Sequence, residues 1–166
     1  MLAIKLNLNL IYSEIGAYMK IRKYQSRDFK QICKVMDQGR MQELRNENLE
    51  LIFIALQDAP YLKYFLSCNI YVAVKNNRIV GFIGYGRHRI EFLYVDPAFQ
   101  GQGVGTELMS FVLNELPRPI KLAVFTNNQA AKNLYKKFGF KVIDTVIEKW
   151  SNEFPVNFSE DTMELK

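Results

Sequence analysis

The sequence predicts a single α/β domain in which strands and helices are mixed along the chain. Apolar residues recur at helical spacing in some segments, and alternate or form short apolar runs in others. A glycine-rich stretch between residues 96 and 106 connects a strand-like segment to a helix-like one. With 166 residues, the chain is long enough to bury a core without metals or disulfides.

The N-terminal part of the chain is predicted to contain one strand and two helices. Residues 1–18 precede the regular pattern and form either an extra edge strand or a loose extension, so the domain itself is expected to span residues 19–166. A strand at residues 19–24 is followed by a helix that Ser26 caps. A second helix is expected from about Gln42 to Gln57, where an Asp-Ala-Pro sequence stops it.

From residue 70 onward the apolar period is that of β-strands. Six strands are expected there, at residues 70–75, 79–86, 89–95, 120–126, 140–150 and 162–166. Two helices separate them. One follows the glycine-rich stretch and ends at about Leu116, and the other begins at Asn127 and ends at Gly139. Residues 151–161 are expected to form a loop between the last two strands.

Three glycines, Gly101, Gly103 and Gly105, lie at alternate positions directly before the first of these two helices. The first N–H groups of a helix have no partner within it and its dipole is positive at this end, so such a loop suits an anionic phosphate. The P-loop pattern is excluded because no Lys-Ser or Lys-Thr follows the glycines. The dinucleotide pattern GxGxxG is excluded because Thr106 occupies the position of its last glycine.

The pattern Gln-x-x-Gly-x-Gly, here Gln100, Gly103 and Gly105, resembles the acetyl-CoA pyrophosphate loop of the GNAT acetyltransferase superfamily. A second motif of that family, Asn-x-x-Ala-x-x-x-Tyr followed by Gly-Phe, is matched further along the chain. Its residues here are Asn128, Ala131, Tyr135, Gly139 and Phe140. The two motifs stand in the order of the family, and the resemblance covers the chain from about Met19 to its end.

The resemblance implies a central, mixed but mostly antiparallel twisted sheet of about six to seven strands flanked by about four helices. It also implies acetyl-CoA as the cosubstrate. The backbone of Leu93, Tyr94 and Val95 is expected to hold the pantetheine arm and to offer an N–H to the oxyanion, while Asn128 contacts the cofactor. The residues expected around the pyrophosphate are Gln100, Gly101, Gln102, Gly103, Val104, Gly105 and Thr106.

Acetyl transfer from a thioester to an amine requires a neutral amine, a stabilised oxyanion and a proton for the departing thiolate. By resemblance Tyr135 lies near the sulfur, and a phenol with a pKa of about 10 can serve as the general acid. The alternative for Tyr135 is packing at the edge of the helix. Glu91, on the strand before the loop, is the candidate base, and its alternative is an ion pair with Arg89. His88 titrates in the right range but lies in a segment that connects strands.

The charge and the cysteine content bear on the ligands of the protein and on its cellular compartment. The formal net charge is +5, and residues 59–90 and 117–143 contain Lys and Arg but no Asp or Glu. These windows indicate attraction of a polyanion such as CoA or nucleic acid, or a solvated basic face. Cys33 and Cys68 form neither a disulfide nor a zinc pattern, which predicts a cytoplasmic protein without a metal. Neither a signal peptide nor a membrane span is expected.

The sequence therefore favours an acetyl-CoA-dependent N-acetyltransferase that acts on a primary amine of a small molecule or of a peptide or protein, as a monomer or homodimer. Two alternatives stay open. One is an enzyme that acetylates aminoacyl-tRNA, as some basic GNAT toxins do, and the other is a non-catalytic acyl-CoA-binding regulatory module. No motif identifies the acceptor. Tyr61, Tyr64 and Phe65 are expected either to line its pocket or to pack in the core.

Overall fold

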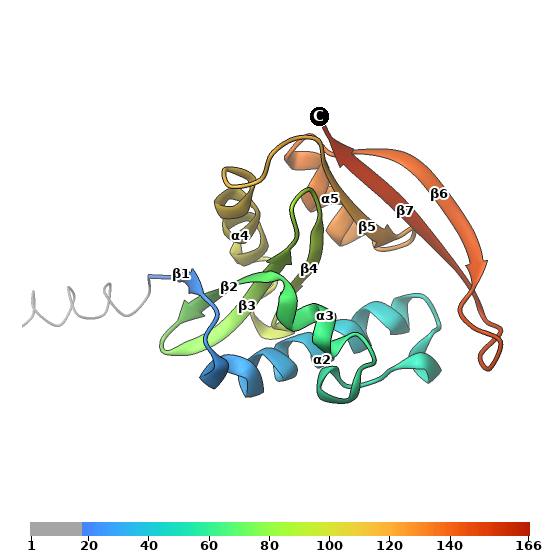
Figure 1. The fold of residues 1–166 in the computed structure, drawn as a ribbon, viewed down its shortest axis with the longest axis horizontal. Coiled ribbons are helices and arrows are strands. Elements are labelled where there is room, and N and C mark those ends of the chain that lie inside the picture. Colours follow the sequence, from blue (N-terminus) through green and yellow to red (C-terminus); the bar gives the residue numbers. More distant parts are fainter. Residues whose placement is uncertain (1–17) are drawn as a thin grey trace, which may run out of the picture.

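Seven strands and four α-helices build residues 18–166, the part of the chain that the computed structural model describes (Figure 1). The strands are β1 (Lys20–Lys23), β2 (Asn69–Lys75), β3 (Arg78–Tyr85), β4 (Ile90–Val95), β5 (Ile120–Phe125), β6 (Lys141–Lys149) and β7 (Asn157–Leu165). The helices are α2 (Phe29–Asn46), α3 (Leu62–Ser67), α4 (Val104–Leu113) and α5 (Gln129–Lys137). The expected mixed α/β class is confirmed. The extension predicted before Met19 lies, apart from Tyr18, outside the described residues.

The strands form two antiparallel sheets that meet at β4 and β5. The first sheet has the order β1-β2-β3-β4 and the second the order β5-β7-β6. A parallel bridge between Arg89 and Lys121 connects the two sheets just before β4 and at the start of β5. Within residues 18–166, β4 and β5 share no further ladder. One edge of β4 is therefore unpaired where the two sheets separate.

Helices cover both faces of the first sheet (Figure 1), and its interior strand β3 is buried at all but its first residue. On one face, Ile32 of α2 and Phe65 of α3 belong to a buried cluster with the sheet. On the other face, Leu108 of α4 packs into a larger cluster, which also holds Phe140 and Met163 of the second sheet region. No helix between residues 18 and 166 combines the length and apolar character needed to cross a membrane.

The helix after β1 differs from the prediction. α2 is one helix of 18 residues that continues through Gly39, so the expected separate helix from Gln42 to Gln57 is wrong. Gly39 lies within the helix without interrupting it. Close packing requires a glycine at this position, because a Cβ there would lie 2.7 Å from Cδ1 of Tyr94. Asn48, with a φ of 58°, follows the helix in the left-handed region. Two 3-10 turns, η2 (Glu50–Ile52) and η3 (Leu56–Asp58), lie in the segment that follows.

The start of α2 also differs, because Ser26 is not its cap. A 3-10 turn, η1 (Ser26–Asp28), precedes the helix. The buried carboxylate of Asp28 accepts hydrogen bonds from the backbone N–H of Gln25 at 2.8 Å and from both terminal nitrogens of Arg22. The acidic residue therefore organises this turn in place of the serine hydroxyl.

The last strand is longer than expected, since residues 157–161 of the predicted loop at residues 151–161 belong to β7. Ser159 and Asp161 give this segment the polarity of a loop. In the fold, the hydroxyl of Ser159 lies 2.8 Å from that of Thr126, and Asp161 accepts a hydrogen bond from Thr145 at 2.7 Å. Polar side chains are thus satisfied inside the sheet, which apolar periodicity does not reveal.

Candidate active site

The glycine-rich stretch forms a tight loop between β4 and α4. Gly101 and Gly103 have φ angles of +72° and +86°, a left-handed conformation that favours glycine. A Cβ at either position would meet nothing within 4 Å, so the backbone conformation requires glycine and the space beside it is open. Gly105 differs, because a Cβ there would lie 3.1 Å from Leu134. This glycine allows α4 and α5 to pack closely.

The loop presents the unpaired N–H groups of α4 to this open space. Gly103 is the N-cap of α4, and the N–H groups of the first helical turn have no carbonyl partner within the helix. Asp96 anchors the other end of the loop. Its buried carboxylate accepts a hydrogen bond from the N–H of Ala98 at 2.9 Å, in the 3-10 turn η4 (Pro97–Phe99), and pairs with Arg78. The loop is therefore preorganised to bind an anion.

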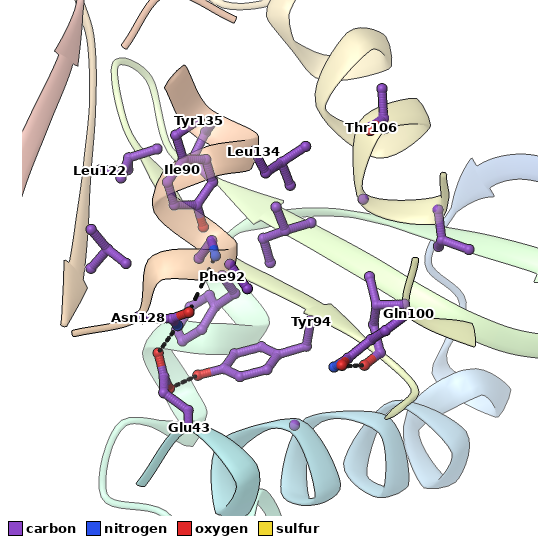
Figure 2. Close-up of a pocket in the computed structure, with 18 of the residues that line it drawn as sticks. Glu43, Ile90, Phe92, Tyr94, Gln100, Thr106, Leu122, Asn128, Leu134 and Tyr135 are labelled. Atoms are coloured by element: carbon purple, nitrogen blue, oxygen red, sulfur yellow. Dashed lines mark hydrogen bonds between the residues drawn. The ribbon is translucent and has the colours of Figure 1, made fainter. Parts of the chain in front are cut away.

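A cavity of about 530 Å³ brings this loop together with β4, α5 and α2 (Figure 2). Of the residues expected to bind the cofactor, all except Gln102 line it. These are Leu93, Tyr94, Val95, Gln100, Gly101, Gly103, Val104, Gly105, Thr106, Asn128 and Tyr135. Gln102 is exposed, and its side-chain amide donates to the carbonyl of Ala98 at 3.1 Å. Motifs far apart in the sequence thus meet at one site.

Tyr135 reaches this cavity from α5. Its side chain has an exposed fraction of 7%, and its hydroxyl points into the cavity (Figure 2). Asn128 caps the same helix, because its Oδ1 accepts a hydrogen bond from the N–H of Ala131 at 3.2 Å. Burial raises the pKa of the Tyr135 phenol, and the negative charge of Glu43 raises it further. The hydroxyl is therefore protonated at neutral pH.

Glu91 also lines the cavity, from β4, with 16% of its side chain exposed. The ion pair expected as its alternative role is present, with 3.3 Å between Nε of Arg89 and Oε2 of Glu91. The neighbouring Glu91 carboxylate raises the pKa of Tyr64 to about 12. His88 is not among the lining residues, and its Nδ1 lies 3.1 Å from the carbonyl oxygen of Pro117.

The aromatic residues of the short α3 region do not line the cavity. Phe65 is fully buried and packs edge to face against Phe82 and Phe92, with ring centroids 5.7 and 5.0 Å apart. Tyr61 stacks on Phe92 with centroids 6.3 Å apart, while Tyr64 is half exposed. The expectation of core packing is confirmed for Phe65.

The contribution of α2 is the part of the site that sequence reasoning missed. Gly39, Gln42, Glu43 and Asn46 all line the cavity, and their spacing puts them on one helical face. Gln42 contacts the glycine-rich loop, because its Oε1 accepts a hydrogen bond from Nε2 of Gln100 at 3.0 Å. The signal in the sequence is this stripe of small and polar residues at helical spacing. The break expected between two helices at this point concealed it.

Glu43 holds the central position on that face. Its Oε2 accepts hydrogen bonds from Arg40 at 2.7 Å and from the hydroxyl of Tyr94 at 3.1 Å. Its Oε1 lies 3.4 Å from Nδ2 of Asn128 on the opposite side of the cavity (Figure 2). One carboxylate thus contacts residues from three elements of the fold.

Comparison with known proteins agrees with this arrangement. Residues 67–142 match the family model described as an acetyltransferase (GNAT) domain. The chain is 33% identical over 101 residues to the peptidyl-lysine N-acetyltransferase YjaB of Escherichia coli, a match that covers 60% of this chain and 62%, less than two thirds, of YjaB. It is 26% identical over 110 residues to the spermine/spermidine N(1)-acetyltransferase of Bacillus subtilis, covering 56% of this chain and 70% of that enzyme. YncA from Salmonella typhimurium, solved with its cofactor acetyl-CoA, superposes with a TM-score of 0.68 at 21% identity and covers 90% of this chain and 94% of YncA.

The matches to N-acetyltransferases indicate acetyl-CoA-dependent acyltransferase activity, and the family model matched by residues 67–142 supports the GNAT superfamily for this chain. Its own geometry fits that cosubstrate: the open left-handed glycines and the first turn of α4 suit the pyrophosphate, and the unpaired edge of β4 suits the amides of the pantetheine arm. Among residues 18–166, no group of His, Cys, Asp and Glu side chains is placed to hold a metal ion.

Proposed function

We propose that the protein transfers the acetyl group of acetyl-CoA to a primary amine of a small molecule or of a peptide or protein. The amine attacks directly, and Tyr135 is the general acid. The observation that carries this proposal is the position of the Tyr135 hydroxyl, which faces the same cavity as the glycine-rich loop and β4. A protonated hydroxyl at that point can donate to the leaving group.

In this proposal, residues 100–106 hold the pyrophosphate through backbone N–H groups of the loop and the first turn of α4. The backbone of Leu93, Tyr94 and Val95, on the unpaired edge of β4, holds the pantetheine arm. A backbone N–H of this strand also stabilises the oxyanion that develops during attack. When bound, acetyl-CoA supplies an activated thioester carbonyl. Asn128 and Tyr135 approach it from α5, on the other side of the cavity.

The proton chemistry is divided between two side chains. A thiol has an ordinary pKa of about 8.5, so the departing thiolate accepts a proton that the Tyr135 phenol holds at neutral pH. Glu91 takes the proton from the attacking amine, directly or through water. Its ion pair with Arg89 holds the carboxylate at the cavity wall.

Two carboxylates line the cavity, and a third lies close to one of them. Glu43 and Glu91 line the cavity, and Glu160 of β7 lies within electrostatic reach of Glu43, Arg40 and Arg89. Burial raises the pKa of Glu160. Since YjaB is named for peptidyl-lysine and the Bacillus subtilis relative for spermine and spermidine, lysine side chains and polyamines are the acceptors to test first.

The proposed setting is the cytoplasm, with the protein as a monomer or homodimer. Both cysteines, Cys33 and Cys68, are free thiols in the structure, the state that a reducing compartment maintains.

The test measures CoA thiol release by the purified protein with acetyl-CoA and either spermidine or a lysine-containing peptide. We expect release that depends on the acceptor, and a fall in kcat of roughly 100-fold for Tyr135→Phe, because general acid catalysis is lost. The Kd of acetyl-CoA, measured by calorimetry, should change less than about twofold, since the pyrophosphate contacts stay intact.

The matched control is Tyr61→Phe, which removes the hydroxyl of a tyrosine that does not line the cavity. Its kcat should equal that of the unmodified protein. An unchanged kcat for Tyr135→Phe, with chemistry rate-limiting, would remove Tyr135 from the mechanism. Binding of acetyl-CoA without transfer to any amine, peptide or tRNA acceptor would instead favour the non-catalytic module.

A further inference from the structure

The two walls of the cavity share little backbone pairing. β4 forms one wall, and β5 with α5 forms the other. Within residues 18–166, the Arg89–Lys121 bridge is the backbone pairing between the two sheets, and it lies at the start of both strands. Beyond that bridge, the separation of the walls depends on side chains. The acetyl donor and the general acid belong to opposite walls, so this separation matters for transfer.

Glu43 connects the two walls from below, from α2 (Figure 2). Its Oε2 accepts the hydrogen bond from Tyr94 of β4 at 3.1 Å, and its Oε1 faces the side-chain amide of Asn128 at 3.4 Å. The sequence separations are 51 and 85 residues, so each bond is a long-range tertiary contact.

The amide of Asn128 transmits this connection to α5. Its oxygen is already engaged as the helix cap at Ala131, which leaves the NH₂ group to donate to Glu43. Tyr135 follows Asn128 by seven residues, which is close to two helical turns and puts both side chains on the same side of α5. The position of Asn128 therefore bears directly on that of the Tyr135 hydroxyl.

The chemistry of a carboxylate suits this task. Both of its oxygens accept hydrogen bonds, so one side chain can accept from Tyr94 and from Asn128 together. Arg40 balances its charge at 2.7 Å and is itself held over the rings of Phe125 and Trp150, at 5.2 and 5.9 Å from their centroids. A glutamine would present its NH₂ group to one of the two donors, and an aspartate would be too short by one carbon.

We propose that Glu43 is a positioning residue of the acetyl transfer reaction. By accepting hydrogen bonds from Tyr94 and Asn128 at once, it sets the distance between the β4 edge that holds the donor and the Tyr135 hydroxyl on α5. This inference rests on the proposed acetyltransferase function and adds a residue that belongs to neither sequence motif.

The test compares Glu43→Gln and Glu43→Ala with Glu47→Gln. Glu47 is the C-cap residue of α2 and accepts the same kind of bond, from the side-chain amide of Asn127 at 3.0 Å, but it does not line the cavity. For both Glu43 variants we expect kcat with spermidine or a lysine peptide to fall roughly 10- to 100-fold, while the Kd of acetyl-CoA changes less than about threefold. Glu47→Gln should stay within about twofold of the unmodified protein.

A second measurement asks whether Glu43 acts through Asn128. Asn128→Ala is introduced alone and together with Glu43→Ala. If Glu43 acts through Asn128, the double variant should be no more than about threefold slower than Asn128→Ala alone. Thermal melting verifies that each variant is folded. If Glu43→Ala does not fold, the nearly isosteric Glu43→Gln takes its place in the kinetic comparison.

Several outcomes would overturn the proposal. If kcat falls equally in the Glu43 and Glu47 variants, the contact between Glu43 and Asn128 is only a structural link between α2 and α5. If the fold-losses in kcat of the two single variants multiply in the double variant, Glu43 does not act through Asn128. Full turnover in the Glu43 variants of an active protein would remove the positioning role alone, whereas absence of acceptor-dependent thiol release in the unmodified protein would overturn the acetyltransferase function as well.

Discussion

The buried ion pair between Lys132 and Asp161 provides the sharpest stability prediction, because it attaches α5 to β7. Asp161 is 2% exposed, and it accepts hydrogen bonds from Lys132, Thr126 and Thr145. The Lys132 side chain is 12% exposed, and its ammonium also donates to the backbone carbonyl of Thr126 at 3.1 Å. Asp161→Asn preserves the size of the side chain but leaves a nearly buried ammonium without its counterion.

The expected loss follows from this burial. Removing one partner of a buried pair typically costs about 3–5 kcal/mol. The small exposure of Lys132 favours the lower end, so we expect the free energy of unfolding to fall by about 3 kcal/mol. For a domain of this size that loss lowers Tm by roughly 6–12 °C. Thermal and urea unfolding followed by circular dichroism would measure both quantities.

Two comparisons make the Asp161 experiment specific. Lys121→Met removes a more exposed pair in the same sheet, with 3.7 Å to Glu164, and should cost less than about 1 kcal/mol. Replacing both partners, with Lys132→Met and Asp161→Leu, should be less damaging than Asp161→Asn, because no unpaired charge is left buried. If Asp161→Asn loses no more stability than Lys121→Met, the reasoning from burial is wrong.

The same pair predicts a pH dependence. Burial alone would raise the pKa of Asp161, but the hydrogen bonds from Lys132, Thr145 and Thr126 outweigh it and hold the pKa below its ordinary value. A carboxyl with a depressed folded-state pKa stabilises the fold above its unfolded pKa of about 3.9, and this contribution is lost as the pH falls through the folded pKa. Asp161→Asn should therefore show a weaker loss of Tm with acid than the unmodified protein. Parallel Tm–pH curves would contradict the assignment.

Two glycine substitutions test the packing and the cofactor loop. In Gly39→Ala, the new Cβ would lie 2.7 Å from the Tyr94 ring, so the gain in helix propensity of about 1 kcal/mol should be outweighed by overpacking of about 1–3 kcal/mol, seen as a lower Tm. In Gly103→Ala, with φ of +86°, we expect a stability loss of about 1–2 kcal/mol and at least tenfold weaker acetyl-CoA binding by calorimetry. Gly139→Ala, at φ of +90° and outside the cavity, is the control and should lose at least as much stability, since its Cβ would also lie 3.3 Å from Leu165, while retaining acetyl-CoA affinity. Equal affinities for the Gly103 and Gly139 variants would count against the phosphate role of the loop.

The amino-acid sequence by itself determined the features that short-range geometry encodes. The glycine-rich loop lies directly before α4 as expected, Asn128 caps α5, and Gly139 follows the end of that helix with a positive φ. Each depends on a few neighbouring residues, and the motifs built from them were enough to indicate the family and the loop, strand and helix that contribute to the cavity lining. The mixed α/β class could be predicted for the same reason, since the spacing of apolar residues along the chain shows which side of each helix or strand is buried.

The tertiary structure alone decided what depends on distant contacts. Gly39 would weaken a helix in isolation, yet α2 continues through it. The Tyr94 ring packs where a side chain at position 39 would lie, so the tertiary contact accounts for a glycine within the helix. β7 includes Asp161 because Lys132 and Thr145 satisfy its carboxylate from other elements. Glu43 enters the site because α2 passes beneath the point where β4 and β5 separate, next to residues 51 and 85 positions away. No local pattern encodes such partners, so the phosphate loop was visible in the sequence and the residue proposed to align the two walls was not.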